Sequence, residues 1–159
     1  MNKFTVPDIC DEHGENIKIC DLFLNSYGKN DKFFGQVETA RCEHSNSIVK
    51  ELVAQNGSNK VLVIQHTGAE KCSMVGDQIA QMAYDNQWKG IITNGYIRDI
   101  EVIKDIPIGV YAKNSIQGKQ TNQLEKARLD QHSSFKILLF KRIHGRMLTP
   151  MELFLVKKN

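Results

Sequence analysis

The sequence lacks long hydrophobic runs. No stretch of its 159 residues approaches the roughly 20 consecutive apolar residues that a membrane-spanning helix needs. The N-terminus turns acidic at Asp8 instead of entering the apolar core of a signal peptide. We therefore expect a soluble, cytoplasmic protein with no membrane partner. With 41% apolar residues the chain is long enough for one domain and too short for two, so we predict a single domain over residues 1–159.

Motifs for zinc or redox chemistry are also missing. The four cysteines contain no Cys-x-x-Cys pair, which argues against a zinc knuckle or a redox dithiol and favours reduced structural thiols. The five histidines are scattered through the chain, so we do not expect a histidine-rich metal site.

Charge is distributed unevenly along the chain. Residues 1–111 carry 11 Lys or Arg against 15 Asp or Glu, whereas residues 112–159 carry 10 against 3, a net charge of about +7. Such a segment can attract polyanions or an acidic protein partner. Aromatic residues make up only 8% of the chain and do not interleave with this charge, and no nucleic-acid motif accompanies it. We expect a solvated basic face, and direct nucleic-acid binding is the weaker alternative.

The first part of the chain predicts alternating strands and helices. Residues 7–30 favour a short helix followed by an extended segment. Residues 33–42 are rich in strand formers, and Ser47 is the predicted N-cap of a helix that ends at Asn56-Gly57. The apolar run at 60–64 is typical of a strand that is buried on both faces.

Residues 60–99 predict a strand, helix and strand in succession. After the first strand, Ser73 opens an amphipathic helix, and residues 90–93 resume a buried strand. Asn94-Gly95 is predicted to turn the chain into Arg98-Asp99. The apolar face of the helix consists of Val75, Ile79, Met82 and Ala83. In a βαβ unit of this kind, ligands usually bind at the carboxyl ends of the strands.

The ends of this unit carry the candidate active site. The first turn of a helix leaves amides without partners, so Gly76-Asp77-Gln78-Ile79 could present them to a substrate carboxylate. Arg98 offers a planar fork to a carboxylate or keto oxygen. Asp99 is a hard oxygen ligand that suits Mg²⁺ or Mn²⁺. Together these groups suit a small α-keto acid.

A metal at Asp99 would polarise a keto group and make cleavage of the adjacent C–C bond accessible, by retro-aldol reaction or decarboxylation. Lys71 or another lysine could instead form an imine, but the sequence shows no apolar setting that would depress a lysine's pKa, so we rank the metal route higher. A solvated Arg98-Asp99 pair, with Asp77 merely complementing the helix dipole, is the alternative without function.

Two segments, VLVIQHTGAEKCSMVGDQIA at 61–80 and NQWKGIITNGYIRD at 86–99, closely resemble a known family. It unites the regulator of ribonuclease E activity A (RraA) with the class II 4-hydroxy-4-methyl-2-oxoglutarate aldolases. Residues 7–11 and 33–37 are similar to its opening helix and first strand. The resemblance covers roughly residues 7–112.

The resemblance implies an α/β fold of the swivelling β/β/α type, with a central sheet and flanking helices. It also implies a homotrimer with sites near subunit interfaces and a Mg²⁺- or Mn²⁺-dependent aldolase. This enzyme splits 4-hydroxy-4-methyl-2-oxoglutarate into two pyruvates and decarboxylates oxaloacetate. Gly76-Asp77-Gln78-Ile79 would match the substrate-binding loop, Arg98 the substrate arginine and Asp99 the metal ligand. Asp77 would orient metal-bound water.

The chain departs from the family pattern in two places before its last third. Active members usually place a further acid three positions after the metal aspartate, where this chain has Val102, and Glu101 stands one residue early. The loop before the helix is often richer in glycine and arginine than the Gly68, Lys71 and Cys72 found here.

The last third departs further from the family. Residues 114–134 are rich in Gln, Asn and Lys and predict a loop or arm; strands are expected at 135–140 and 153–156, with a turn at His144-Gly145. The regulator branch of the family supplies a competing hypothesis, a non-catalytic trimer that binds and inhibits ribonuclease E or a similar RNA-processing partner. The two acid pairs favour the enzyme, whereas the basic last third favours an interaction role.

Overall fold

The computed structural model describes residues 17–20, 23–69, 71–116, 135–139 and 153–157. The elements in chain order are β1 (Ile17–Cys20), β2 (Asn25–Ser26), β3 (Phe33–Cys42), α2 (Ser47–Val53), β4 (Lys60–His66), β5 (Ser73–Val75), α3 (Asp77–Asp85), β6 (Gly90–Ile97), α4 (Ile100–Ile103), β7 (Gly109–Ser115), β8 (Phe135–Leu139) and β9 (Leu153–Lys157). The helices of these ranges are all too short or too polar to reach across a bilayer.

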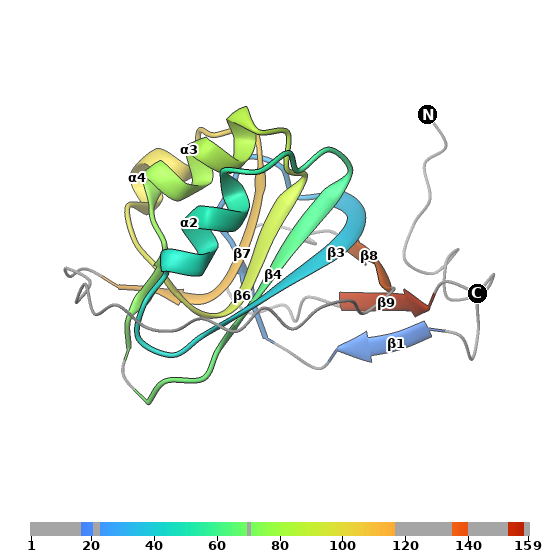
Figure 1. Ribbon diagram of the computed structural model, residues 1–159, viewed down its shortest axis with the longest axis horizontal. Coiled ribbons are helices and arrows are strands. Elements are labelled where there is room, and N and C mark those ends of the chain that lie inside the picture. Colours follow the sequence, from blue (N-terminus) through green and yellow to red (C-terminus); the bar gives the residue numbers. More distant parts are fainter. Residues whose placement is uncertain (1–16, 21–22, 70, 117–134, 140–152, 158–159) are drawn as a thin grey trace.

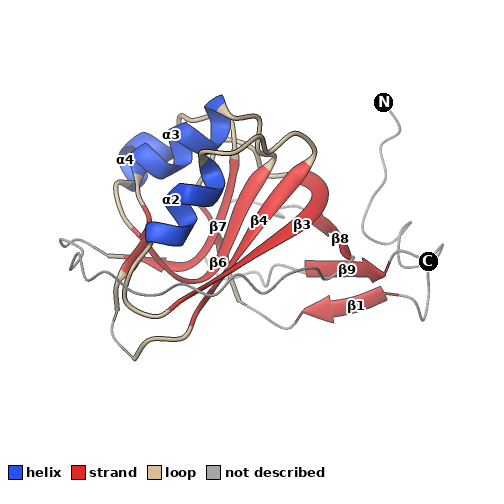
Figure 2. Cartoon of the chain, in the orientation of Figure 1, coloured by secondary structure: helices blue, strands red, loops and turns tan. Residues whose placement is uncertain are grey.

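The strands form one mixed sheet in the order β1-β9-β8-β3-β4-β6-β7-β2, and β5 pairs with β6. Strands β3, β4, β6 and β7 run parallel to one another, and β2 and β8 join them antiparallel. The three helices α2, α3 and α4 cover one face of this sheet (Figures 1 and 2). The predicted α/β class, with a central sheet and flanking helices, is therefore confirmed.

The core lies on both faces of the sheet because successive side chains of a strand point to opposite faces. Leu62, Ile91 and Val110 belong to the large cluster that packs with the helices. A smaller cluster on the other face consists of Leu24, Phe33, Val61, Ile92 and Tyr111. In it, the rings of Phe33 and Tyr111 lie 5.6 Å apart.

Two glycines make room for the Phe33 ring, because a Cβ at Gly90 or Gly109 would overlap it. We expect Gly109→Ala to lower the free energy of unfolding by about 2 kcal/mol, the usual cost of overpacking a core. Urea denaturation would measure this loss. The control is Phe34→Ala, since the Phe34 side chain is 71% exposed and its loss should change stability by less than about 0.5 kcal/mol. Equal stability of Gly109→Ala and the wild type would contradict the prediction.

The helix predicted to begin at Ser73 in fact begins at Asp77, so that prediction was wrong. Residues 73–75 form strand β5, which pairs with Tyr96 and Ile97 of β6. Met74 and Val75 are fully buried in this strand. Their apolar character merged with the periodicity of the following helix and concealed the boundary between the two elements.

The turn predicted at Asn94-Gly95 is also wrong, because β6 continues through it with a shift of register. The Asn94 side chain bonds to the backbone of His66 at the end of β4: the His66 amide donates to Asn94 Oδ1 at 2.6 Å, and Asn94 Nδ2 donates to the His66 carbonyl at 3.1 Å. A tertiary contact thus keeps this asparagine in a strand, where local propensity favours a turn.

The remaining boundaries agree with the prediction or shift by a few residues. The helix predicted after Ser47 includes Ser47, has Asn46 at its N-cap and ends at Val53 instead of Asn56. The strands predicted at 33–42, 60–64, 135–140 and 153–156 are confirmed as β3, β4, β8 and β9. Asn114 and Ser115, predicted in a loop, belong to β7. The opening helix at 7–11, the turn at His144-Gly145 and residues 117–134 of the arm lie outside the described residues.

Candidate active site

The site is built where β5 ends, α3 begins and β6 ends. Gly76 is the N-cap of α3 and has an extended backbone, and Asp77 is the first helical residue. Arg98 follows β6 directly, and its amide donates to the Val75 carbonyl at 3.0 Å. This bond joins the ends of the two parallel strands and brings the start of α3 next to Arg98.

Gly76 allows the closest approach in the site. A Cβ at this position would lie 2.9 Å from Asp99 Oδ2 and 3.1 Å from Arg98 Nε. The predicted residues Gly76, Arg98 and Asp99 are therefore brought together, although Gly76 precedes the other two by 22 and 23 positions in the sequence. The absence of a side chain at Gly76 lets the arginine and the carboxylate approach the backbone at the start of α3.

Asp99 has an unusual backbone. Its φ of 57° and ψ of 36° lie in the left-handed region, at the N-cap of α4, and its side chain makes no capping hydrogen bond. Instead, Asp99 Oδ2 lies 3.0 Å from Arg98 Nε, and both side chains are about one third exposed. Non-glycine residues in this region are uncommon and often belong to functional sites. The Asp99 carboxylate is thus held at the surface beside the arginine.

The start of α3 leaves fewer open amides than the sequence predicts. The Gln78 amide donates to Asp77 Oδ1 at 2.7 Å, so it is occupied. The first helical bond joins the Ala80 amide to the Gly76 carbonyl. The amides of Asp77 and Ile79 have no hydrogen-bond partner among the described residues. These two remain at the positive end of the helix to bind an anion.

A small pocket of about 40 Å³ opens at this place. Two of its lining residues, Asn46 and Lys50, come from α2 and were not predicted, because nothing in the sequence indicates that α2 borders the site. Asn46 Nδ2 donates to the Met74 carbonyl at 3.3 Å and so connects α2 to β5. The pocket is lined by Asn46, Lys50, Ser73, Gly76, Asp77, Gln78, Ile79 and Arg98.

The loop between β4 and β5 contains a contact that sequence reasoning missed. Cys72 Sγ lies 3.3 Å from His66 Nε2, across a loop of six positions. The neighbouring Lys71 places its ammonium 5.9 Å from the centre of the Tyr96 ring. Lys71 does not line the pocket, which disfavours the imine route for this lysine.

The described start of α4 offers Asp99 no unpaired second carboxylate. Glu101 accepts a hydrogen bond from Lys104 Nζ, and this bond and the lysine charge lower the pKa of the Glu101 carboxyl below its ordinary value. Val102 is 52% exposed at the position where an acid is expected. Among the described residues no group of three His, Cys, Asp or Glu side chains could hold a metal ion. Any metal would depend on Asp99, water and the substrate.

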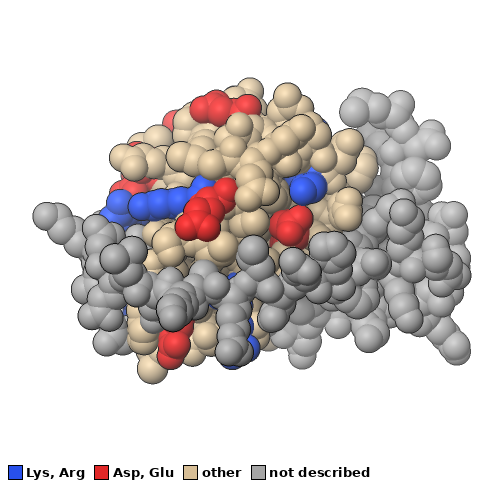
Figure 3. Space-filling model, in the orientation of Figure 1, with Lys and Arg blue, Asp and Glu red and all other residues tan. Residues whose placement is uncertain are grey.

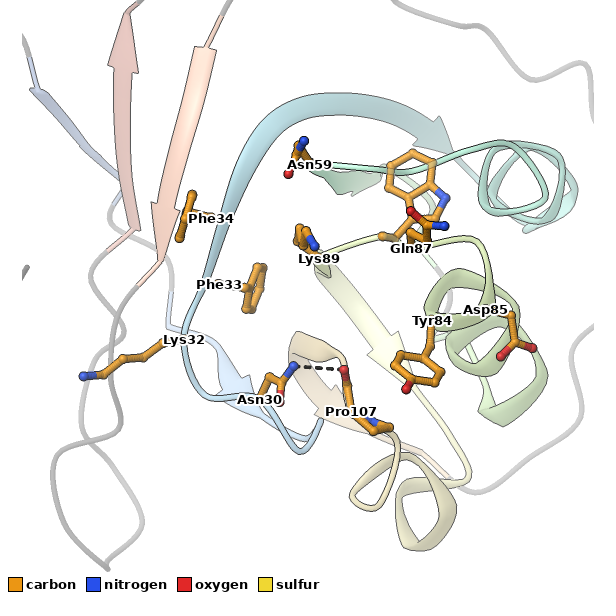
Figure 4. A pocket seen from close by; sticks show the side chains of 11 residues that line it. Asn30, Lys32, Phe33, Phe34, Asn59, Tyr84, Asp85, Gln87, Lys89 and Pro107 are labelled. Carbon is orange, nitrogen blue, oxygen red and sulfur yellow. Dashed lines mark hydrogen bonds between the residues drawn. The ribbon is translucent and has the colours of Figure 1, made fainter. Parts of the chain in front are cut away.

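A larger cavity of about 760 Å³ lies at the opposite ends of the strands (Figure 4). Asn59, Lys89 and Pro107, which precede β4, β6 and β7, line it, and Asn30 Nδ2 donates to the Pro107 carbonyl at 2.9 Å. Its lining has one carboxylate, Asp85, and no arginine. Size alone does not make it the better candidate, since the carboxyl ends of parallel strands are where α/β sheets usually bind ligands.

Charged side chains are mixed on the face shown in Figure 3. Acidic and basic groups lie interspersed there, and the described residues of that face form no patch of one sign. Most of the basic last third lies outside the described residues. Its predicted role as a solvated face stays a prediction.

Comparison with known proteins identifies the family. The sequence profile of the RraA-like family, described as Aldolase/RraA, matches residues 6–139. The chain belongs to this family. An RraA-like protein of Marinomonas, whose name as a 4-hydroxy-4-methyl-2-oxoglutarate aldolase is provisional, is 43% identical over 110 residues, which cover 69% of this chain and 68% of that protein.

Solved structures of RraA-like fold agree with this assignment. The RNA-processing inhibitor RraA of Thermus thermophilis matches with a TM-score of 0.83 at 21% identity and covers 99% of this chain and 96% of that chain. A Geobacillus kaustophilus protein described as an S-adenosylmethionine:2-dimethylmenaquinone methyltransferase matches with a TM-score of 0.82 at 23% identity, covering 98% and 96%. The RraA fold predicted from the sequence is confirmed, while the functions of these distant relatives are their own.

Proposed function

We propose that this RraA-like protein is a divalent-metal-dependent lyase of small α-keto acids. It would cleave 4-hydroxy-4-methyl-2-oxoglutarate into two pyruvates and decarboxylate oxaloacetate. The observation that carries the proposal is the close approach of the paired Arg98 and Asp99 side chains to Gly76 at the start of α3. The provisional aldolase name of the Marinomonas relative supports it.

Each residue of the site has a distinct role in this reaction. Arg98 and the open amides of Asp77 and Ile79 bind and orient the carboxylate and keto oxygen of the substrate. Asp99 would hold a Mg²⁺ or Mn²⁺ ion, which usually needs only one or two protein carboxylates and keeps several waters. Such an ion supplies the Lewis acidity that stabilises charge on the keto oxygen while the C–C bond breaks. Asp77 Oδ1 accepts a hydrogen bond from the Gln78 amide, which holds this side chain in place. Asp77 would orient the water that exchanges a proton with the product.

The decisive experiment is an assay of pyruvate release. Oxaloacetate and 4-hydroxy-4-methyl-2-oxoglutarate are supplied separately, with Mg²⁺, with Mn²⁺ and with a chelator. We expect turnover with metal and its loss with chelator, because Asp99 alone cannot polarise the keto group. Absence of metal-dependent turnover on both substrates would reject the lyase.

A regulator is the second candidate function, and the missing acid near Asp99 favours it. Val102 stands at the position where an acid is expected, and the neighbouring Glu101 is paired with Lys104. A protein of this kind would bind a ribonuclease E-like partner without turnover of its own. The same preparation should therefore be tested for binding to ribonuclease E fragments. Binding without turnover would favour this candidate over the enzyme.

We also propose that residues 1–159 form one domain and that the chain assembles as a homotrimer with sites near the subunit interfaces. Light scattering would test the assembly, with an expected mass near three times 18.1 kDa. A mass near 18.1 kDa would reject the trimer.

Replacing Val102 by an acid should strengthen metal binding. In Val102→Asp a second carboxylate would stand on α4 close to Asp99, whose carbonyl accepts the Val102 amide at 3.0 Å. We expect the metal concentration for half-maximal turnover to fall by about tenfold, since a second oxygen ligand completes more of the coordination sphere. Titration of Mn²⁺ in the pyruvate assay measures it. Glu101→Gln is the control and should leave this concentration unchanged, because Glu101 is paired with Lys104.

A further inference from the structure

Lys50 contributes a second cation to the small pocket, from a different element than Arg98. It lies one turn after Asn46 on α2, with its amide donating to the Asn46 carbonyl at 3.1 Å. Both residues line the pocket. The pocket is therefore lined by a lysine from α2 and by an arginine at the end of β6.

The two cations differ in how far their charge is already neutralised. Arg98 Nε is paired with Asp99 Oδ2 at 3.0 Å. Lys50 Nζ makes no hydrogen bond or ion pair with any described residue, and its side chain is exposed. The one acid in the lining, Asp77, has its Oδ1 bound by the Gln78 amide. Lys50 therefore presents a charge that a ligand can neutralise.

Lys50 and Arg98 line the same pocket. A substrate whose keto-acid end binds at Arg98 and the open amides would therefore have a second, exposed cation within the same opening. A keto monoacid such as pyruvate has no second carboxylate that could bind Lys50.

We propose that Lys50 binds the second carboxylate of the substrate and sets a preference for keto diacids over keto monoacids. This inference rests on the proposed function, because it assumes that the keto-acid end binds at Arg98. Lysine suits this role because its charge sits at the end of a flexible four-carbon stem, so it can follow second carboxylates that lie at different distances from the keto group. The second carboxylate is one carbon farther from the keto group in 4-hydroxy-4-methyl-2-oxoglutarate than in oxaloacetate.

Steady-state kinetics of Lys50→Gln provide the first test. We expect the KM for oxaloacetate to rise by about tenfold, the usual scale for losing one exposed charge-assisted hydrogen bond, with kcat changed less than about threefold. Inhibition by pyruvate, which has no second carboxylate, should stay within about twofold. Lys50→Arg keeps the charge and should restore most of the lost affinity. Lys89→Gln is the matched control, because it removes one exposed lysine at the opposite ends of the strands.

Calorimetric binding in the presence of Mg²⁺ provides a second test that needs no turnover. The ligands are 2-oxoglutarate, a keto diacid, and 2-oxobutanoate, a keto monoacid. Wild type should prefer the diacid, and Lys50→Gln should lose this preference. If Lys50→Gln loses the preference for the diacid although wild type shows no turnover, the result supports the Lys50 inference and rejects the lyase. An unchanged preference or an unchanged KM in Lys50→Gln, or an equal change in Lys89→Gln, would overturn the Lys50 inference and leave the lyase standing.

Discussion

Asp99→Asn is expected to reduce metal-dependent pyruvate release by about a thousandfold, equivalent to roughly 4 kcal/mol of transition-state stabilisation. Asparagine keeps the size of the side chain and tolerates the left-handed backbone that Asp99 adopts. The variant therefore removes the carboxylate charge and little else. Measurement of kcat/KM for oxaloacetate at saturating Mn²⁺ gives the size of the effect.

Asp105→Asn is the matched control for Asp99→Asn. Asp105 is exposed and lies six positions further on, so its loss changes the net charge by the same amount without touching the site. Thermal melting of both variants should agree with wild type within a few degrees. Turnover of Asp99→Asn near the wild-type rate would mean that Asp99 does not hold the metal.

Gly76→Ala is the second change with a large expected effect on activity. The added methyl group would lie 2.9 Å from Asp99 Oδ2 and 3.1 Å from Arg98 Nε, so both side chains would have to shift away from the positions in which they are proposed to bind metal and substrate. We expect kcat/KM to fall by about a hundredfold, since misplacing catalytic groups by a fraction of an ångström is costly. The pyruvate assay measures the loss.

The fold should tolerate Gly76→Ala well. The backbone of Gly76 has a φ of −121°, which alanine adopts without strain. The atoms nearest to the new methyl group belong to side chains that are about one third exposed and can move. An unchanged melting temperature together with low activity would support the proposed role. Loss of folding, or full activity, would contradict it.

The strands and the βαβ unit could be predicted because apolar runs and periodic patterns are local properties of the sequence. The buried run at 60–64 and the strand formers at 33–42 illustrate this, since each forms the predicted strand. The start of α3 could not be located, because Met74 and Val75 are apolar in both a strand and a helix. Only their pairing with β6 decides between the two.

The candidate site was predictable only in part for the same reason. The proximity of Gly76 to Arg98 follows from the order of strand, helix and strand, so sequence reasoning could reach it. The contributions of Asn46 and Lys50 depend on how α2 is placed on the sheet, and no local pattern contains that information. The occupied amide of Gln78 depends on the side-chain conformation of Asp77, which is equally invisible in a sequence.

Strand β6 changes its neighbour halfway along its length. Its first half, from Gly90 to Thr93, pairs with β4, and its second half pairs with β5. Asn94 lies at this change. Its side-chain amide makes two hydrogen bonds to the backbone of His66 at the end of β4, as the backbone of a paired strand would. Beyond this point β5 takes the place of β4 beside β6, and Gly76 follows directly after β5. Asn94 has no part in the proposed chemistry, yet it binds the end of β4 at the point where β5 becomes the neighbour of β6.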